Sequence, residues 1–265
     1  MSYAARFALL LVLSFGTAAW AFDVTDCDQE VPEGEVGVLT TDLDCGSNTV
    51  PGSYGVELER GATLDMQGHT ITGAQWAVYC PGPGICAVTS TTGTPGTITG
   101  AEAGIWTPDT KLVASNLHLV GNAYAISNNP KTTLIRVTFA DNGFALTTRS
   151  LRATDVQITG SCGAGYCFDL GKGRIEGLVT TDTGPSATVV QVSHSITMRF
   201  ASMSGSPGQL GVVARSIKIR DSVVTGHGID LASRGLRALD VACDRSRRFG
   251  EDGLVIGTFG VCTND

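Results

Sequence analysis

A basic side chain or a histidine recurs through the second half of the chain, just before each of seven successive repeats. If the repeats stack about 4.8 Å apart, neighbouring cations in one column repel by roughly 1 kcal/mol even in water, and folding alone would not select them. Such a stripe could bind a linear anionic polymer, namely an acidic polysaccharide or a cell-envelope polymer. Alternatively, the side chains lie over turn surface and pair with aspartates. The seven residues are Lys111, Lys131, Arg149, Lys172, His194, Arg215 and Arg234.

The cysteines are a second group with recognisable chemistry. All eight follow residue 21 and form four pairs when taken in order along the chain. An even number of cysteines favours disulfides in an oxidising compartment, although eight cysteines allow 105 connectivities. A metal site is the alternative, but the closely paired spacing typical of zinc ligands is absent. The predicted disulfides are Cys27–Cys45, Cys80–Cys86, Cys162–Cys167 and Cys243–Cys262.

The beginning of the chain resembles an export signal. Arg6 precedes the apolar run at residues 7–13, and residues 19–21 read Ala-Trp-Ala, a small-x-small cleavage pattern. We therefore expect a signal peptide over residues 1–21, cleaved near Ala21 and Phe22, and a secreted, periplasmic or cell-surface protein. A retained signal anchor is the alternative. No later stretch approaches the roughly 20 apolar residues that a membrane span needs.

Composition narrows the possible partners and folds. The formal net charge of −7 argues against a general nucleic-acid binder, although it leaves room for a local basic patch. The 34 glycines argue against long helices. The oligomeric state is left open by these features.

Three eleven-residue blocks align without a gap, with apolar residues at the second, fourth and ninth positions and glycine at the eleventh. They begin at Ser150, Ser195 and Ser216, and weaker copies occur elsewhere. Between them lie short strand-like pieces at spacings of 20 to 22 residues. This period predicts an all-β chain folded as a parallel β-helix of about 8–9 coils, each of about 18–27 residues. A two-sheet sandwich is the alternative, but it does not explain blocks that repeat at a constant offset.

Stacked coils imply stacked side chains and protected ends. Tyr124, Phe144 and Tyr166 should stack, and Asn122 and Asn142 should begin an asparagine ladder. The glycine- and proline-rich stretch 81–96 should project from the stack. Because an open β-helix exposes sheet edges, the disulfide-bearing ends are interpreted as caps. The expected organisation is an N-terminal cap at 22–54, the β-helix at 55–242 and a C-terminal cap at 243–265.

One segment carries a family resemblance. Residues 62–73, ATLDMQGHTITG, resemble a coil of secreted bacterial right-handed parallel β-helix repeat proteins of the pectin-lyase-like superfamily. The cysteine-bearing lead-in and the closing GVCTND are also similar. The resemblance implies a single-stranded right-handed parallel β-helix. It does not select a function, since the superfamily includes polysaccharide lyases, polygalacturonases, uronan epimerases and many proteins of unknown role.

The resemblance also suggests a search for calcium ligands. Asp155, Asp221 and Asp240 occupy equivalent positions, but only Asp221 and Asp240 are in neighbouring coils. They are weak calcium candidates, since a good site needs six to eight oxygens. Alternatively, they are solvated turn residues paired with Arg220 or Arg237. No other cofactor is expected.

No catalytic residue is identified. His69 is interpreted as structural, His118 should face outward on a strand, and His194 and His227 should lie in turns without a triad partner. We therefore predict a non-catalytic β-helix protein that recognises an acidic polymer through its basic stripe. A polysaccharide lyase or hydrolase is the alternative.

Overall fold

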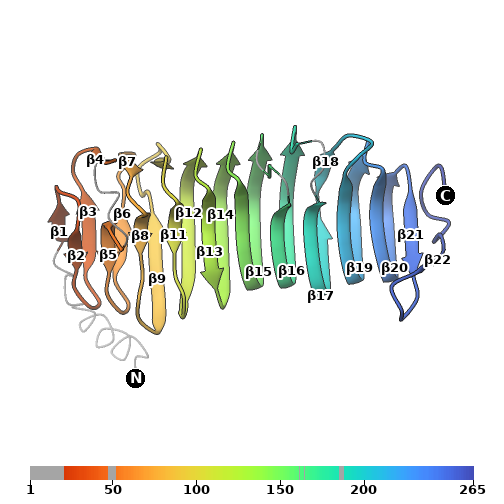
Figure 1. The fold of residues 1–265 in the computed structure, drawn as a ribbon, viewed down its shortest axis with the longest axis horizontal. Coiled ribbons are helices and arrows are strands. Elements are labelled where there is room, and N and C mark those ends of the chain that lie inside the picture. The colour runs from red at the N-terminus through yellow and green to blue at the C-terminus, as the bar shows by residue number, and fades with distance from the viewer. Residues whose placement is uncertain (1–20, 47–51, 161, 164, 185–187) are drawn as a thin grey trace, which may run out of the picture.

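The computed structural model describes residues 21–46, 52–160, 162–163, 165–184 and 188–265, and these form a parallel β-solenoid of about 8 turns (Figure 1). All regular structure in these residues is β-strand, so the predicted all-β fold is confirmed. The expected signal peptide, residues 1–21, lies outside the described residues except for Ala21.

The strands are short near the beginning of the solenoid and much longer after residue 110. The short ones are β1 (Ala21–Val24), β2 (Gln29–Val31), β3 (Val36–Leu39), β4 (Leu43–Cys45), β5 (Tyr54–Leu58), β6 (Thr63–Asp65), β7 (Thr70–Gly73), β8 (Trp76–Tyr79), β9 (Gly84–Thr89), β10 (Gly96–Thr99) and β11 (Ala103–Trp106). They are followed by β12 (Thr110–Val120), β13 (Tyr124–Asn129), β14 (Lys131–Ala140), β15 (Phe144–Thr159), β16 (Tyr166–Thr181), β17 (Thr188–Arg199), β18 (Ser202–Ser204), β19 (Leu210–Thr225), β20 (Ile229–Cys243), β21 (Ser246–Phe249) and β22 (Val255–Gly257).

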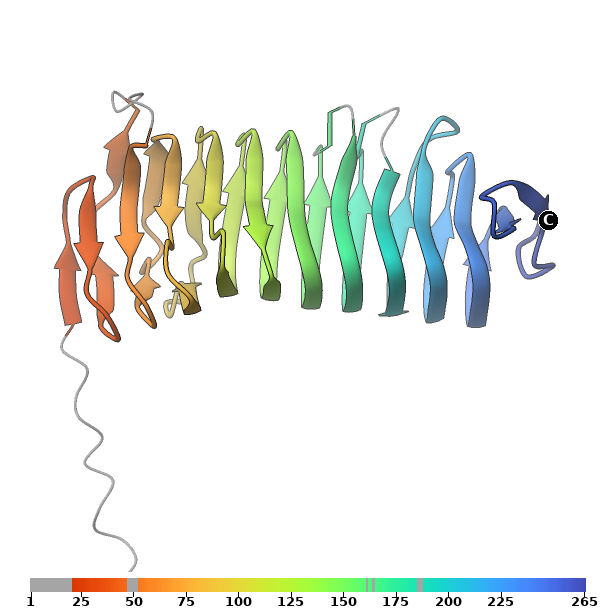
Figure 2. The same cartoon turned by 60° about the horizontal axis from the view of Figure 1, so that its bottom comes forward.

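Each coil pairs in parallel with the next. In the first part a strand pairs with the one three places later, as β5 does with β8 and β8 with β11. Later strands run through corners, so that β15 pairs with β16 along three successive stretches separated at Arg149 and Asp155. Only β21 and β22 are antiparallel among the described strands. The chain therefore advances steadily along one axis, as the colours of Figure 2 show.

The repeated blocks fall into the predicted register. Ser195 pairs with Ser216, and Ile196 with Ile217, in adjacent strands. Ile217 and Ile219 are fully or almost fully buried, whereas Lys218 between them is exposed. The inward and outward assignment of the blocks is thus confirmed, and one apolar core runs through the stack.

One corner of the coil is formed by left-handed backbone. Each coil from β12 to β20 has one residue with a positive φ at this corner. The residues are Asn116, Arg136, Asp155, Gly177, Phe200, Asp221 and Asp240, with φ between 51° and 73°. Gly, Asn and Asp tolerate this conformation best, which accounts for most of that column. The aligned aspartates therefore have a backbone explanation.

Side-chain ladders reinforce the stack. The Asn142 side-chain oxygen accepts hydrogen bonds from the backbone N–H and the side-chain amide of Asn122, both at 3.0 Å. The Asn122 oxygen in turn accepts from the backbone N–H of Ala101 at 3.0 Å. The rings of Tyr124 and Phe144 stack with centroids 5.0 Å apart. The asparagine ladder and this ring pair are as predicted.

The motif in residues 62–73 builds a corner. Asp65 accepts hydrogen bonds from the hydroxyl and backbone N–H of Thr91 and from the backbone N–H of Gln67. Burial alone would raise the pKa of Asp65, but these hydrogen bonds hold it below its usual value. Gln67 and Gly68 both have positive φ. The motif is thus explained by turn geometry.

The stretch 81–96 does not project as expected. Part of it is strand β9, which pairs with both β6 and β12. The loop that follows is bound to the stack, because the Asn116 amide donates to the carbonyl oxygens of Ser90 at 2.9 Å and Thr92 at 3.0 Å. The prediction failed because a turn-rich composition does not reveal these side-chain contacts.

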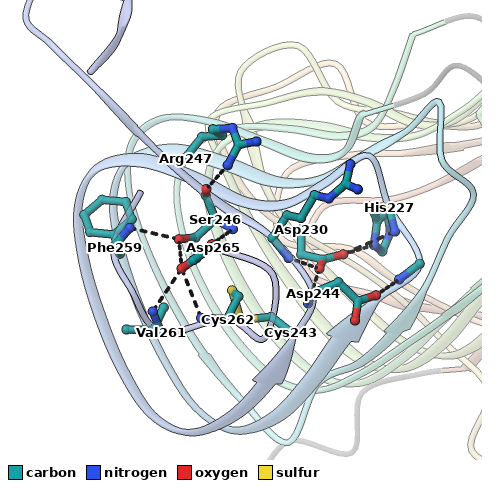
Figure 3. Close-up of a disulfide and its surroundings, with 12 residues drawn as sticks. His227, Asp230, Cys243, Asp244, Ser246, Arg247, Phe259, Val261, Cys262 and Asp265 are labelled. Atoms are coloured by element: carbon teal, nitrogen blue, oxygen red, sulfur yellow. Dashed lines mark hydrogen bonds and ion pairs between the residues drawn. A yellow bond between two sulfur atoms is a disulfide. The ribbon is translucent and has the colours of Figure 1, made fainter. Parts of the chain in front are cut away.

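All four predicted disulfides are present, and no described cysteine is free. Figure 3 shows Cys243–Cys262 beside the Asp265 carboxylate, which accepts hydrogen bonds from Ser246 and from the backbone N–H groups of Val261 and Cys262. Burial opposes but does not outweigh these hydrogen bonds, so the pKa of Asp265 is also below its usual value. At the other end, β1 to β4 already pair with later coils, so the region expected to be a cap contributes strands to the stack.

Candidate functional site

The seven residues of the predicted stripe are exposed along one corner of the solenoid, but they do not form a single column. Lys111, Lys131 and Lys172 share one register position, with Ser150 between the last two. The remaining four stand one residue earlier in their coils, because Ser150, Ser195, Ser216 and Gly235 occupy the lysine position there. The single column is therefore wrong, and two adjacent columns replace it. The second column contains Arg149, His194, Arg215 and Arg234.

None of these seven side chains forms an ion pair with a carboxylate of the described residues. The Arg234 guanidinium donates instead to the backbone carbonyl of Glu251 at 2.8 Å. Pairing with aspartates therefore does not explain these cations.

The columns border a larger basic surface that the sequence pattern did not reveal. Two positions after the Lys111 column, the outward-facing side chains of neighbouring strands include Arg152, Arg174, Lys218 and Arg237. Arg152 pairs directly with Arg174, and Lys218 with Arg237, with Thr197 between the two pairs. Alternation along each strand places this row on the same outer side as the lysines. Three sets of residues together are called the basic face. They are the column of Lys111, Lys131 and Lys172, the row described here, and the row of Arg199 and Arg220 described in the next paragraph.

A third row lies two positions further along the strands. Arg199 pairs with Arg220, and both approach the Asp221 carboxylate, at 4.0 Å and 3.9 Å. The Arg199 guanidinium also lies 4.9 Å from the ring centroid of Phe200. Asp221 thus neutralises part of this row. A shallow hollow of about 280 Å³ is lined by Arg199, Arg220, Lys218 and Arg237.

A second depression lies where the corner meets the end of the solenoid. His194, Arg215 and Arg234 line a cleft of about 650 Å³ together with Arg248 and Glu251. Three arginines and one histidine thus line one cleft together with one carboxylate.

Charge is divided sharply along the chain. Residues 21–110 contain 13 acidic side chains and one basic side chain, Arg60, whereas residues 111–265 contain 12 acidic and 16 basic ones. A protein with a net charge of −7 therefore still has an excess of basic side chains in residues 111–265. The total charge therefore does not exclude nucleic acid as a ligand of this face.

The calcium candidates Asp221 and Asp240 both line one open hollow of about 640 Å³. Asp221 lies beside Arg199 and Arg220, and no group of three or more His, Cys, Asp or Glu side chains in the described residues is placed to hold a metal ion. The left-handed backbone at Asp221 and Asp240 accounts for their alignment.

The histidines include one arrangement that sequence reasoning missed. His227 and Asp230 are completely buried, with His227 Nδ1 3.0 Å from Asp230 Oδ1 (Figure 3). The other Asp230 oxygen accepts the backbone N–H groups of Asp244 and Arg245, and His227 Nε2 lies against Gly205. His227 Nε2 is buried without a hydrogen-bond partner among the described residues, so it is the Asp230 carboxylate that links this corner to the next coil. A His-x-x-Asp spacing in a turn is the only sequence signal for it.

The remaining histidines have simpler environments. His69 Nδ1 lies 3.2 Å from Asp42 Oδ1, which also accepts the backbone N–H of Thr70 at 2.8 Å. His118 is half-buried between buried Leu117 and Leu119, which confirms its outward orientation.

The fold and site define a class of architecture, a parallel β-solenoid with four disulfides and a basic outer face. Comparisons with protein families, curated proteins and solved structures found no match. In the described part of the chain, no helix has both the length and the apolar character that a membrane crossing requires.

Proposed function

We propose that this is an exported, non-catalytic protein that binds an acidic polysaccharide or cell-envelope polymer along its basic face. The observation that carries the proposal is the row of like charges in register, Arg152 with Arg174 and Lys218 with Arg237. Strands about 4.8 Å apart place these charges close enough to repel by about 1 kcal/mol at the dielectric of water. A bound polyanion would remove that repulsion.

The shape of the surface favours a linear polymer over a small anion. The cations are spread over strands from β12 to β20, and the hollow between Arg199 and Arg237 is shallow. A chain lying along the solenoid axis would meet a cation in most coils. The cleft at His194, Arg215 and Arg234 would hold one end of that chain.

Four disulfides support the exported location, because such bonds persist in oxidising compartments. We also propose that the apolar run at residues 7–13 is part of an export signal.

Retention on immobilised polygalacturonate, eluted with a salt gradient, tests the proposal. Exposed charges are screened beyond about 8 Å at physiological ionic strength, so retention should fall steeply with salt. The double variant Arg174→Gln/Lys218→Gln should weaken binding at least tenfold. The matched control Arg60→Gln/Arg245→Gln removes the same charge elsewhere and should leave binding nearly unchanged.

Several results would contradict the proposal. Wild-type protein that passes through polygalacturonate and heparin columns at low salt has no such site, and equal losses in both double variants would show that binding depends only on total charge. Tighter binding to duplex DNA than to any polyuronate would assign the face to nucleic acid. Unsaturated products released when the protein is incubated with soluble polygalacturonate would show a lyase.

A further inference from the structure

The C-terminal segment leaves one side of the last full coil uncovered. β21 pairs with β20 only over residues 231–233, and further along the coil the backbone N–H of Thr263 donates to the carbonyl oxygen of Cys243 at 2.9 Å. Between these two contacts lie residues 235–239 of β20, which pair with β19 alone among the described strands. We call residues 235–239 the open edge.

The end of the apolar core is exposed at the open edge. Ile217 and Ile219 in the coil before are 0% and 2% exposed, because β20 covers them. Their register partners Leu236 and Ala238 are only partly buried, because no described strand covers them in turn. Leu239, which points to the outer side, is 61% exposed. The open edge therefore combines a strand that has one neighbour with apolar side chains that are incompletely covered.

The charges around the open edge are basic. Arg237 lies at its centre, is exposed, and pairs in register with Lys218 of β19. Neither side chain forms an ion pair with a carboxylate of the described residues. An acidic side chain on an added strand would lie beside Arg237, as opposite charges do in cross-strand pairs.

We propose that the open edge binds an extended acidic segment of another protein, which adds to β20 as a further strand. Hydrogen bonds between the two main chains would supply affinity, and alternate side chains would supply specificity. Because successive side chains of a strand point to opposite faces, apolar residues of the segment would cover Leu236 and Ala238 while acidic residues meet Arg237. The recognised pattern is therefore an alternation of apolar and acidic residues along the open edge.

A second copy of this chain fits the open edge less well than a single extended strand. Two open edges paired about a two-fold axis would bring the two Arg237 side chains together, along with the neighbouring Lys218 side chains. End-to-end stacking is also hindered, because β21 and β22 extend beyond β20 at this end of the solenoid (Figure 1). A single strand meets neither obstacle.

This ligand is separate from the polymer proposed for the basic face, although Arg237 contributes to both surfaces. Binding of a polyanion depends on its charge, whereas strand addition also requires peptide N–H groups on the ligand. Each proposal can therefore fail without the other.

Fluorescence anisotropy of a labelled peptide, Val-Asp-Val-Glu-Val-Asp-Val, titrated with the disulfide-bonded protein, tests the inference. The peptide should bind saturably at one site. The same peptide N-methylated at every residue keeps its charge but loses its backbone donors, so it should bind at least tenfold more weakly. A peptide with lysine in place of each acidic residue should not bind.

A matched pair of variants locates the peptide on the protein. Leu239→Glu places a carboxylate beside those of the bound peptide and should weaken binding at least tenfold. Leu254→Glu, at a comparably exposed leucine outside the open edge, should change binding less than twofold. Equal effects of the two variants would contradict the inference.

Three other results would overturn it. One is no binding of the acidic peptide. Equal binding of its N-methylated form would assign the peptide to the basic face as a polyanion and leave the proposed function intact. Finally, sedimentation velocity could show wild-type dimers that are lost in Leu239→Glu, and a second copy would then be the occupant of the open edge.

Discussion

The solenoid contains two regions with the same backbone repeat and opposite surfaces. Residues 21–110 form short strands, and their outer side carries carboxylates. Residues 111–265 form long strands that continue through corners and carry 16 of the 18 basic residues. Inward-facing positions are apolar in both regions. The fold therefore requires apolar side chains at the inward-facing positions, whereas the outward-facing side chains can differ from one region to the other.

The two regions also form their corners differently. Near Asp65 the turn also contains left-handed residues, but in addition the Asp65 carboxylate accepts hydrogen bonds from Thr91 and Gln67. Later corners use left-handed residues that can be Asn, Asp, Gly, Arg or even Phe200. At corners of the first type, stability should depend on pH and fall even with conservative substitution of the carboxylate. At corners of the second type, stability should depend on how well the substituted residue tolerates a positive φ. The predictions below test this difference.

The largest effect is expected in the core that both regions share. Ile71→Asp in the first region and Ile217→Asp in the second each bury an unpaired charge, which should cost more than about 4 kcal/mol and prevent folding of the whole chain. Lys218→Asp, on the outer side of the same strand as Ile217, should leave the protein folded and no less stable, because the new carboxylate is exposed and pairs in register with Arg237. Urea unfolding followed by circular dichroism measures these changes.

Separate unfolding of the two regions would contradict the prediction that they share one core. A protein with Ile71→Asp that retained a cooperative transition for the later strands would show two independent cores. Equal tolerance of Asp at positions 217 and 218 would contradict the inward and outward assignment.

The next largest effect is expected where the two regions meet, at the asparagine ladder. Asn142→Ala removes the oxygen that accepts two hydrogen bonds from Asn122, whose side chain is buried. Leaving buried donors unpaired should lower the free energy of unfolding by about 2–3 kcal/mol. Asn264→Ala, an exposed asparagine away from the ladder, is the control and should change it little. Equal effects would show that the ladder is not stabilising.

Sequence reasoning predicted the parts of this fold that depend on local period. The blocks at Ser195 and Ser216 have a fixed alternation of apolar and polar residues, so their register and core positions could be predicted. The disulfides were also predicted, because the pairs that are adjacent in sequence are adjacent in the stack.

The sequence alone could not show which side chains are neighbours in adjacent coils, because the coils differ in length. The Lys111 column was merged with the position before it, because only strand pairing shows that Ser150, Ser195, Ser216 and Gly235 occupy the lysine position. The basic row was missed for the same reason. Arg152 and Arg174 are 22 residues apart, and only pairing of their strands shows that they are neighbours.

A smaller effect is expected from acid at the Asp65 corner. A carboxylate whose pKa is lowered by folding stabilises the protein above its unfolded pKa, about 3.9, and loses this contribution as pH falls through the folded value. Asp65→Asn should therefore lower stability by about 1–2 kcal/mol at pH 7, with the difference from wild type shrinking below about pH 4. Thermal unfolding between pH 3 and pH 7 measures this. The exposed Asp23→Asn is the control, and a gap independent of pH would contradict the assignment.

The smallest effects are expected at the left-handed corner, where they distinguish backbone geometry from calcium binding. Asp240 has φ of 52°, a conformation that glycine adopts without penalty and that costs a β-branched residue about 1–2 kcal/mol. Asp240→Gly should therefore change stability by less than about 0.5 kcal/mol, and Asp240→Val should lower it by about 1–2 kcal/mol. Millimolar calcium should leave the thermal midpoint of all three proteins unchanged. If calcium instead raised the midpoint of wild type and not of Asp240→Gly, the carboxylate would be a ligand. Because the same column contains Gly177 and Phe200, which offer no side-chain oxygen, we expect the backbone explanation to hold.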